Sequence, residues 1–226
     1  MGPLLFQKHL VTNKIKKMKK IIVVLVVFMG YNTAKAQQIK DLKYFYTDNV
    51  YGQSSNSITF GRKYYKDLNN YFNPFLGQWK STTGNQTFVV TFWKETKRPT
   101  KQNGEVLFYS DEIFGHYQIY VDYGLSTQSL LYTSQINIGN MSQIWDTVIL
   151  GNAINPFEFY GSIHDVVGIP LNVDFPQGVE GSLSMTINSS TSPLTAQWKI
   201  TRSSGMRRTN QPSTFTIPTN VVLTKI

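Results

Sequence analysis

Short runs of alternating apolar and polar residues, separated by turn-forming residues, occupy the sequence from Gln78 onward. In such a run every second side chain faces the same side of a sheet, as Phe88, Val90 and Phe92 do in the second run. The pattern predicts strands at residues 78–83, 87–94, 105–109, 116–123, 129–138, 145–150, 157–164, 181–188, 194–202 and 220–226. No helical pattern lies between them, so we expect an antiparallel sheet rather than a parallel α/β fold.

The number and close spacing of these strands predict an all-β fold. We expect an antiparallel up-and-down β-barrel, with a β-sandwich as the alternative. Gly84 and Asn85 should join the first two strands, because both residues tolerate the backbone conformation of a two-residue hairpin turn. Residues 63–73 carry apolar side chains at near-helical spacing, and the residue before Pro74 is disfavoured in a helix. These residues are therefore expected to form one short N-terminal helix.

The beginning of the chain has the features of a secretory signal peptide. Lys19 and Lys20 precede an apolar run at residues 21–29, and Ala34-Lys35-Ala36 is a small-x-small cleavage site. A retained membrane anchor is disfavoured, because a spanning helix needs about 20 apolar residues. We expect cleavage after Ala36 and a secreted or periplasmic protein. Met18 is the expected start, with a long basic n-region as the alternative.

Removal of residues 1–36 changes the charge of the protein. These residues contain seven lysines and no acidic residue, so the net charge falls from +9 to +2. Nucleic acid is therefore not an expected partner. The chain has no cysteine, so a packed core rather than disulfides must stabilise an exported domain. We expect an N-terminal arm at residues 37–62 and a single barrel domain at 63–226, monomeric and without a membrane span after processing.

The segment from Pro74 to Lys80 contains Gly77-Gln78-Trp79, placed between the expected helix and the first strand. Helix, Gly-x-Trp and antiparallel meander together resemble the calycin group, which includes the lipocalins and the fatty-acid-binding proteins. With its signal peptide the layout is similar to small uncharacterised lipocalin-like proteins secreted by Bacteroidetes. The resemblance implies that Gly77 lets the chain turn into the barrel and that Trp79 closes one end. It also implies that Arg202 or Lys199 packs over the Trp79 ring.

The resemblance implies an exported, non-enzymatic protein that binds a small hydrophobic ligand or lipid inside the barrel. A barrel of eight or more strands can enclose such a ligand. Aromatic residues in the middle of the chain are the candidate lining, with plain core packing as the alternative; they are Tyr109, Tyr117, Tyr120, Tyr123, Phe157, Phe159 and Tyr160.

Charge is distributed unevenly along the mature chain. Residues 102–198 contain no Lys or Arg but nine acidic residues, whereas both flanking segments are basic. The first and last strands of a closed meander are neighbours, so the basic segments are expected to form one positive side. Loops at residues 97–101 and 202–208 could then recognise an anionic glycan, lipid head groups or an acidic protein partner. Solvated charge without a binding role is the alternative.

Catalytic chemistry has few candidate residues. His116 and His164 are the histidines of the mature chain, and no nucleophile elbow accompanies them. A metal site built from His116, Asp111 and Glu112 matches no recognised ligand spacing. The adjacent acids Asp111 and Glu112, or Asp122, leave a carboxylate-dependent hydrolase as a third class of function. We expect no cofactor.

Overall fold

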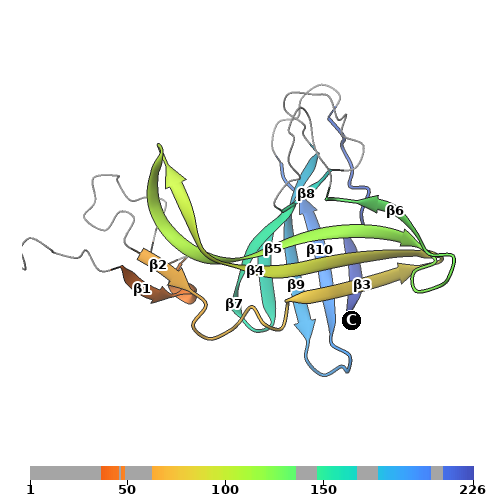
Figure 1. Ribbon diagram of the computed structural model, residues 1–226, viewed down its shortest axis with the longest axis horizontal. Coiled ribbons are helices and arrows are strands. Elements are labelled where there is room, and N and C mark those ends of the chain that lie inside the picture. The colour runs from red at the N-terminus through yellow and green to blue at the C-terminus, as the bar shows by residue number, and fades with distance from the viewer. Residues whose placement is uncertain (1–36, 46, 49–62, 136–146, 167–177, 205–210) are drawn as a thin grey trace, which may run out of the picture. The chain divides into compact units, whose positions relative to one another are not determined.

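The computed structural model describes residues 37–45, 47–48, 63–135, 147–166, 178–204 and 211–226 (Figure 1). The predicted signal peptide and its cleavage site lie outside these residues. All described strands belong to one compact unit, Gln38–Ile226. Within the described part of the chain, no helix is long and apolar enough to cross a membrane.

Strands dominate the described residues, and one 3₁₀ turn, η1 (Leu42–Tyr44), follows the first strand. The strands are β1 (Gln38–Asp41), β2 (Lys63–Lys66), β3 (Gly77–Thr83), β4 (Gln86–Gln102), β5 (Glu105–Val121), β6 (Ser129–Thr133), β7 (Ile149–Asn155), β8 (Glu158–Asp165), β9 (Val179–Asn188), β10 (Thr195–Arg202) and β11 (Asn220–Lys225).

Among the described residues, eight strands close into an antiparallel barrel. They pair in the order β5-β4-β3-β11-β10-β9-β8-β7, and β7 returns to β5 through the pair Phe114 and Leu150. Strand β6 pairs with the last part of β5. The predicted all-β fold and antiparallel barrel are confirmed, in preference to the sandwich.

The short hairpin and several strand boundaries follow from local sequence. Gly84 has a φ of +61° in the turn between β3 and β4, as a tight hairpin requires. Two predicted strands, 105–109 and 116–123, are parts of the single strand β5. Strand β4 likewise continues beyond Lys94 to Gln102. The alternation of apolar and polar residues is weaker where both faces of a strand are covered, so the sequence-based prediction split β5 into two strands.

The short helix predicted at residues 63–73 is wrong. Residues 63–66 form β2, which pairs in parallel with β5 through Tyr64 opposite Tyr109. The chain then turns, because the Asp67 carboxylate accepts the backbone N–H groups of Tyr71 and Phe72. Tertiary pairing and this side-chain cap override the near-helical spacing, since a carboxylate that bonds nearby backbone offers an alternative to helix.

Strands β4 and β5 are longer than the barrel requires, and their outer parts leave it as a hairpin (Figure 1). On one side of this hairpin β2 pairs with β5, and β1 pairs with β2. We call residues 38–41, 63–66 and 96–110 the projecting sheet. It includes β1 of the predicted N-terminal arm, whose residues 49–62 lie outside the described part.

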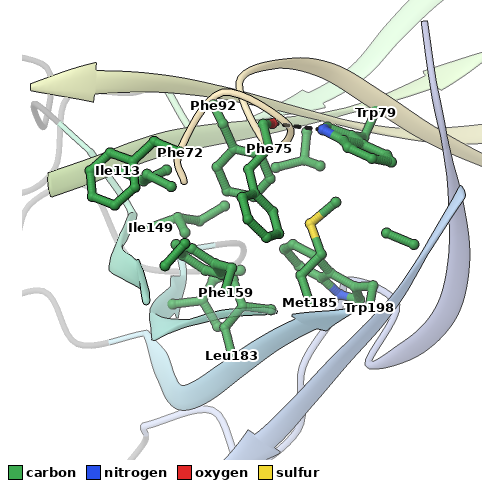
Figure 2. Close-up of a cluster of buried hydrophobic side chains, with 14 of the residues drawn as sticks. Phe72, Phe75, Trp79, Phe92, Ile113, Ile149, Phe159, Leu183, Met185 and Trp198 are labelled. Carbon is green, nitrogen blue, oxygen red and sulfur yellow. Dashed lines mark hydrogen bonds between the residues drawn. The ribbon is translucent and has the colours of Figure 1, made fainter. Parts of the chain in front are cut away.

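The core fills the barrel with large side chains (Figure 2). Trp79, Trp198 and Phe159 are almost completely buried. Glycines make room for them: a Cβ atom on Gly151 would lie 2.6 Å from Phe159 Cζ, and one on Gly161 would lie 2.9 Å from the same atom. A Cβ atom on either glycine would lie closer still to a backbone oxygen of the paired strand, so the two glycines allow both the close approach of β7 to β8 and the placement of the Phe159 ring.

Candidate functional site

The predicted ligand lining is not gathered in one place. Tyr117 and Phe159 face the barrel interior and are buried. Phe157 and Tyr160 are 48% and 47% exposed. The remaining members lie elsewhere: Tyr120 and Tyr123 are in mutual ring contact at the end of β5, and Tyr109 is on the projecting sheet.

Side chains of the protein itself occupy the interior that a ligand would need. Phe92 and Phe159 have ring centroids 5.5 Å apart, and Phe88 lies 5.6 Å from Trp198. Phe75 adds a fifth ring, 6.1 Å from Phe159. An eight-stranded barrel is just wide enough for side chains to fill it. The described side chains in this barrel fill its interior in the same way.

Two segments of the chain lie across the ends of the barrel. The turn at residues 67–76 inserts Phe72 and Phe75, both fully buried, and the Trp79 indole N–H donates to the Phe75 carbonyl at 2.7 Å. At the other end, residues 211–219 bury Ile217. Trp198 donates its indole N–H to the carbonyl of Pro218 in that segment at 2.9 Å.

The cation that packs over Trp79 comes from the last strand. Lys225 lies opposite Trp79 in the β11–β3 pair, with its Nζ 5.5 Å from the ring centroid and donating to the Pro74 carbonyl at 2.7 Å. Burial lowers the pKa of Lys225. This arrangement differs from the expected one, because Arg202 lies at the far end of β10 and donates to the Ser213 carbonyl. Lys199 is exposed on the same strand.

Gly77, the other residue implied by the resemblance, begins β3. Its φ of +101° lies in the region that favours glycine. Gly77 therefore allows the chain to pass from the turn at residues 67–76 into the barrel wall.

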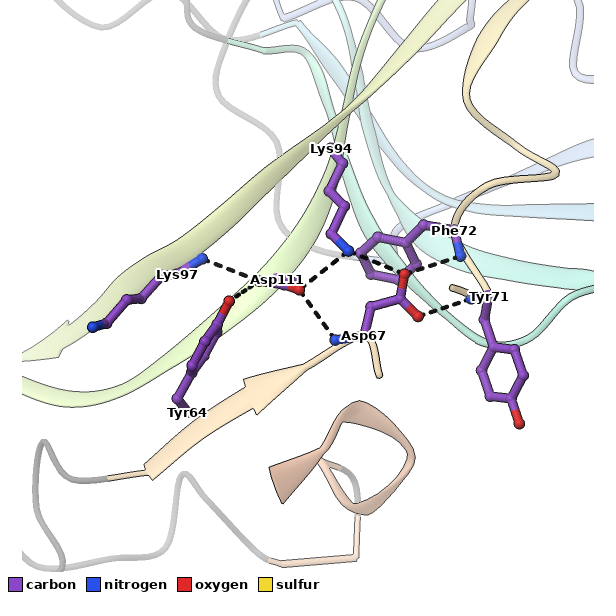
Figure 3. Close-up of polar contacts among 7 residues, drawn as sticks. All are labelled: Tyr64, Asp67, Tyr71, Phe72, Lys94, Lys97 and Asp111. Carbon is purple, nitrogen blue, oxygen red and sulfur yellow. Dashed lines mark hydrogen bonds and ion pairs between the residues drawn. The ribbon is translucent and has the colours of Figure 1, made fainter. Parts of the chain in front are cut away.

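A buried network of charges lies where the projecting sheet meets the barrel (Figure 3). Asp111 on β5 is fully buried and accepts hydrogen bonds from the Tyr64 hydroxyl at 2.5 Å and from the backbone N–H groups of Asp67 and Lys97, both at 3.1 Å. The Lys94 ammonium lies 3.2 Å from its second oxygen. Both oxygens of this carboxylate are thus occupied.

Asp67 is the second carboxylate of the network. Its oxygens accept from the backbone of the turn and from Lys94 Nζ at 3.2 Å. Lys94 also lies over the Phe72 ring, 5.3 Å from its centroid. One ammonium therefore joins β4, β5 and the turn that covers the end of the barrel.

The ionisation of the network follows from these bonds. Burial alone would raise the pKa of Asp111, but hydrogen bonds from Tyr64 and from backbone N–H groups, together with Lys94, hold it below its ordinary value. Burial and the neighbouring Asp111 raise the pKa of Tyr64. At neutral pH an ionised aspartate accordingly faces a protonated tyrosine. With no free oxygen, Asp111 is placed to hold structure rather than to exchange protons with a substrate.

The main chain is irregular next to this network. The register between β4 and β5 shifts between Glu95 and Arg98, which marks a β-bulge. Lys97, within the bulge, has a φ of 55°. Its ammonium is exposed and lies 5.6 Å from the Tyr109 ring centroid and 6.0 Å from that of Tyr64.

The predicted carboxylate pair does not form a facing pair. Glu112 follows Asp111 on a strand and therefore points to the opposite face. There it accepts from Ser110 at 2.8 Å and lies 3.9 Å from Arg98. Burial raises the pKa of Glu112, opposed by Ser110 and Arg98. Asp122 accepts from Thr127 in the turn after β5.

The two histidines occupy separate sites. His116 is buried, stacks on Trp93 with ring centroids 5.5 Å apart, and contacts the Ser134 hydroxyl through Nδ1 at 3.0 Å. His164 is more exposed and lies 3.6 Å from Glu180. Among the described residues, no group of three or more His, Cys, Asp or Glu side chains could hold a metal ion.

A second buried polar cluster lies beside the segment at residues 211–219. Asp165 accepts from the Tyr117 hydroxyl at 2.8 Å and from the backbone N–H of Thr216 at 2.5 Å. The Val166 N–H donates to the same Tyr117 hydroxyl at 3.2 Å. Nearby, the hydroxyl of Tyr132 is buried and has no partner at ordinary hydrogen-bond geometry among the described residues, although the Tyr117 hydroxyl is close enough to lower its pKa against the effect of burial. This cluster fixes the covering segment to the barrel wall.

The described basic residues of the two expected loops lie in strands. Lys97 and Lys101 belong to β4 within the projecting sheet, and so to a strand rather than a loop. Arg202 ends β10 in the barrel wall. Residues 205–208 lie outside the described part.

Sequence reasoning named Asp111 but missed Tyr64, Asp67 and Lys94, the side chains that bind it. Asp111 is separated from Tyr64 by 47 positions and from Asp67 by 44. No short motif connects residues so far apart. One local signal was available, since an Asp preceding a polar turn often caps backbone N–H groups.

The fold and its interior define the protein as a small all-β protein built on a closed antiparallel barrel with a packed core. The chain belongs to a family described as a family of unknown function (DUF6705), which matches residues 18–226. No curated protein and no solved structure gives a significant match.

Proposed function

We propose that the protein is an exported, non-enzymatic binding protein that recognises its partner through its surface, with the projecting sheet as the binding part. The packed barrel carries this proposal. Rings of Phe75, Phe92 and Phe159 occupy the interior, and segments of the same chain cover both ends. When the side chains of a barrel fill its interior, a partner must bind to the outer surface.

The projecting sheet is suited to this role because it is firmly attached and carries exposed cations. The network around Asp111 anchors it to the barrel. Four exposed lysines on and beside it form no ion pair with the described residues; they are Lys43, Lys66, Lys97 and Lys101. These cations favour an anionic glycan or an acidic protein as the partner.

Export remains part of the proposal, supported by the signal-peptide pattern that ends at Ala36. The closed barrel and the placement of Gly77 and Trp79 at its start support a relationship to the secreted lipocalin-like proteins of Bacteroidetes. Expression of the full chain in a bacterial host tests export. We expect the mass of a chain beginning at Gln37 in the exported fraction, whereas an uncleaved cytoplasmic product would contradict it.

Native mass spectrometry of the exported protein, combined with lipid extraction, tests surface recognition against an internal ligand. We expect the mass of the protein alone and no uptake of a hydrophobic dye. A co-purified apolar molecule would overturn the proposal and favour a lipocalin-like carrier.

A small ligand with a polar group is the second candidate, favoured by one observation. Among the described residues, the buried Tyr132 hydroxyl has no partner at ordinary hydrogen-bond geometry, and leaving a buried hydroxyl unpaired costs about 1–3 kcal/mol. A ligand group bonded to Tyr132 would recover that energy. The same mass measurement tests this candidate: a molecule that co-purifies with the native chain but not with Tyr132→Phe supports it.

A further inference from the structure

Lys97 has a backbone conformation that needs an explanation. Its φ of 55° is in the left-handed region, which residues other than Gly, Asn and Asp seldom adopt. The bulge between Glu95 and Arg98 imposes this conformation. Strained residues persist where the surrounding structure holds them, and they gather at functional sites. Bulges also redirect side chains next to such sites.

The buried side of the bulge shows what holds it. Asp111 accepts the Lys97 backbone N–H at 3.1 Å, and Tyr64 and Lys94 fix the Asp111 carboxylate in turn. Figure 3 shows the Lys97 side chain extending away from Asp111. The network therefore fixes the main chain at Lys97 while its ammonium stays outside.

The surroundings of the ammonium distinguish it from neighbouring cations. Lys94 is shared by two aspartates, and Arg98 lies 3.9 Å from Glu112 and 4.5 Å from the Phe114 ring centroid. Lys97 instead has two tyrosine rings beside it and, among the described residues, no carboxylate within ion-pair distance. Its charge is available to an anion, and the half-buried Tyr109 ring adds an apolar surface.

We propose that Lys97 binds the carboxylate or sulfate group of an acidic polysaccharide and that Tyr109 contacts the apolar face of the sugar ring beside that group. The inference rests on the proposed surface-binding function and names its ligand class. Of the exposed lysines of the projecting sheet, Lys97 differs in having two tyrosine rings beside its ammonium. A cation next to an aromatic ring suits an acidic sugar, which offers an anionic group and an apolar C–H face side by side.

Binding of the mature protein to three polymers tests the proposal: heparin carries sulfate, polygalacturonate carries carboxylate, and dextran is neutral. We expect binding to at least one acidic polymer and none to dextran. Lys97→Asn should weaken that binding about fivefold to tenfold, as expected for the loss of one charge-assisted contact. The matched control is Lys199→Asn, which removes the same charge from an exposed site on β10. It should weaken binding less than about twofold.

Stability measurements separate a binding role from a structural one. Asn tolerates the left-handed region and keeps the N–H that Asp111 accepts, so Lys97→Asn should unfold at the same urea concentration as the native chain or a higher one. Tyr109→Leu keeps the charge and should still weaken polysaccharide binding.

Each possible failure points to a different step. Equal losses in Lys97→Asn and Lys199→Asn would overturn the Lys97 site while leaving surface binding intact. Binding to neither acidic polymer, or equal binding to dextran, would overturn the ligand class. A co-purified apolar molecule would overturn the proposed function itself.

Discussion

Replacing Asp111 by Asn tests whether the buried network holds the projecting sheet to the barrel. The amide is nearly the same size as the carboxylate, so packing is preserved and the charge is lost. Asp111 accepts from four donors, two on each oxygen. Asn can accept on one side only, because its NH₂ group would face two donors on the other.

The expected loss is large because the site is fully buried. Removing one partner of a buried, hydrogen-bonded ion pair costs about 3–5 kcal/mol. For a chain of this size a urea dependence of about 2 kcal/mol per molar moves the unfolding midpoint down by about 2 M. Glu112→Gln is the matched control on the next residue. Glu112 has one hydrogen bond from Ser110 and a distant Arg98, so its loss should stay below about 1 kcal/mol.

Equilibrium urea unfolding, followed by tryptophan fluorescence, measures both variants. Hydrogen exchange then locates the effect: Asp111→Asn should lose protection in β2 and in the turn at residues 67–76 before the barrel strands lose it. If Asp111→Asn and Glu112→Gln differ by less than about 1 kcal/mol, the network does not hold the projecting sheet and the reasoning is refuted. Lys94→Met added to Asp111→Asn should deepen the loss, because Lys94 also pairs at 3.2 Å with the buried Asp67 carboxylate, which would then lose its cation.

Three further predictions concern acid stability, core packing and the Trp79 contact. The pKa of Asp111 in the folded protein is below its unfolded value of about 3.9, so the ionised carboxylate stabilises the fold fully above about pH 3.9 and loses this effect as the pH falls through the folded pKa. The fall in urea midpoint between pH 5 and pH 3 should therefore be smaller in Asp111→Asn than in the native protein. An identical fall in both proteins would contradict this prediction. Gly151→Ala should lower stability by about 1–3 kcal/mol in thermal unfolding, because the added Cβ would lie 2.6 Å from a Phe159 carbon and closer still to the Tyr160 backbone oxygen. An unchanged melting temperature would show that β7 and β8 can move apart to make room. Lys225→Met keeps the apolar stem but leaves the Pro74 carbonyl unpaired, which should lower the free energy of unfolding by about 1–3 kcal/mol. The control Lys199→Met should change it by less than about 0.5 kcal/mol. Equal losses in the two variants would show that the Lys225 contact does not stabilise the barrel end.

Local patterns predicted the barrel strands well and the residues around Tyr64 badly. The alternation of Phe88, Val90 and Phe92 needs no knowledge of neighbouring strands, because one buried face is enough to produce it. Tyr64 and Tyr65 are adjacent and both buried, so they lie on opposite, covered faces of β2. Such a pair carries no period of two, and with Leu68 and Phe72 it imitates a helix.

In the candidate sites, too, the sequence predicted the residue types but not their positions in space. Aromatic composition predicted where large side chains occur but not which way they face: Tyr117 points into the barrel, whereas Phe157 is exposed. A basic residue over Trp79 was expected from the penultimate strand. The register of β11 against β3 supplies Lys225 instead.

The sequence by itself determined the all-β class, the antiparallel pairing and the turn at Gly84, since these depend on alternation and turn chemistry between near neighbours, but it left a barrel and a sandwich as alternatives. Only the tertiary structure decided the closure of β7 onto β5, the projecting sheet and the network around Asp111. These features join residues far apart in the chain. The free energy that selects them comes from packing rings together and from giving buried charges their hydrogen-bond and ion-pair partners, which come from distant segments of the chain.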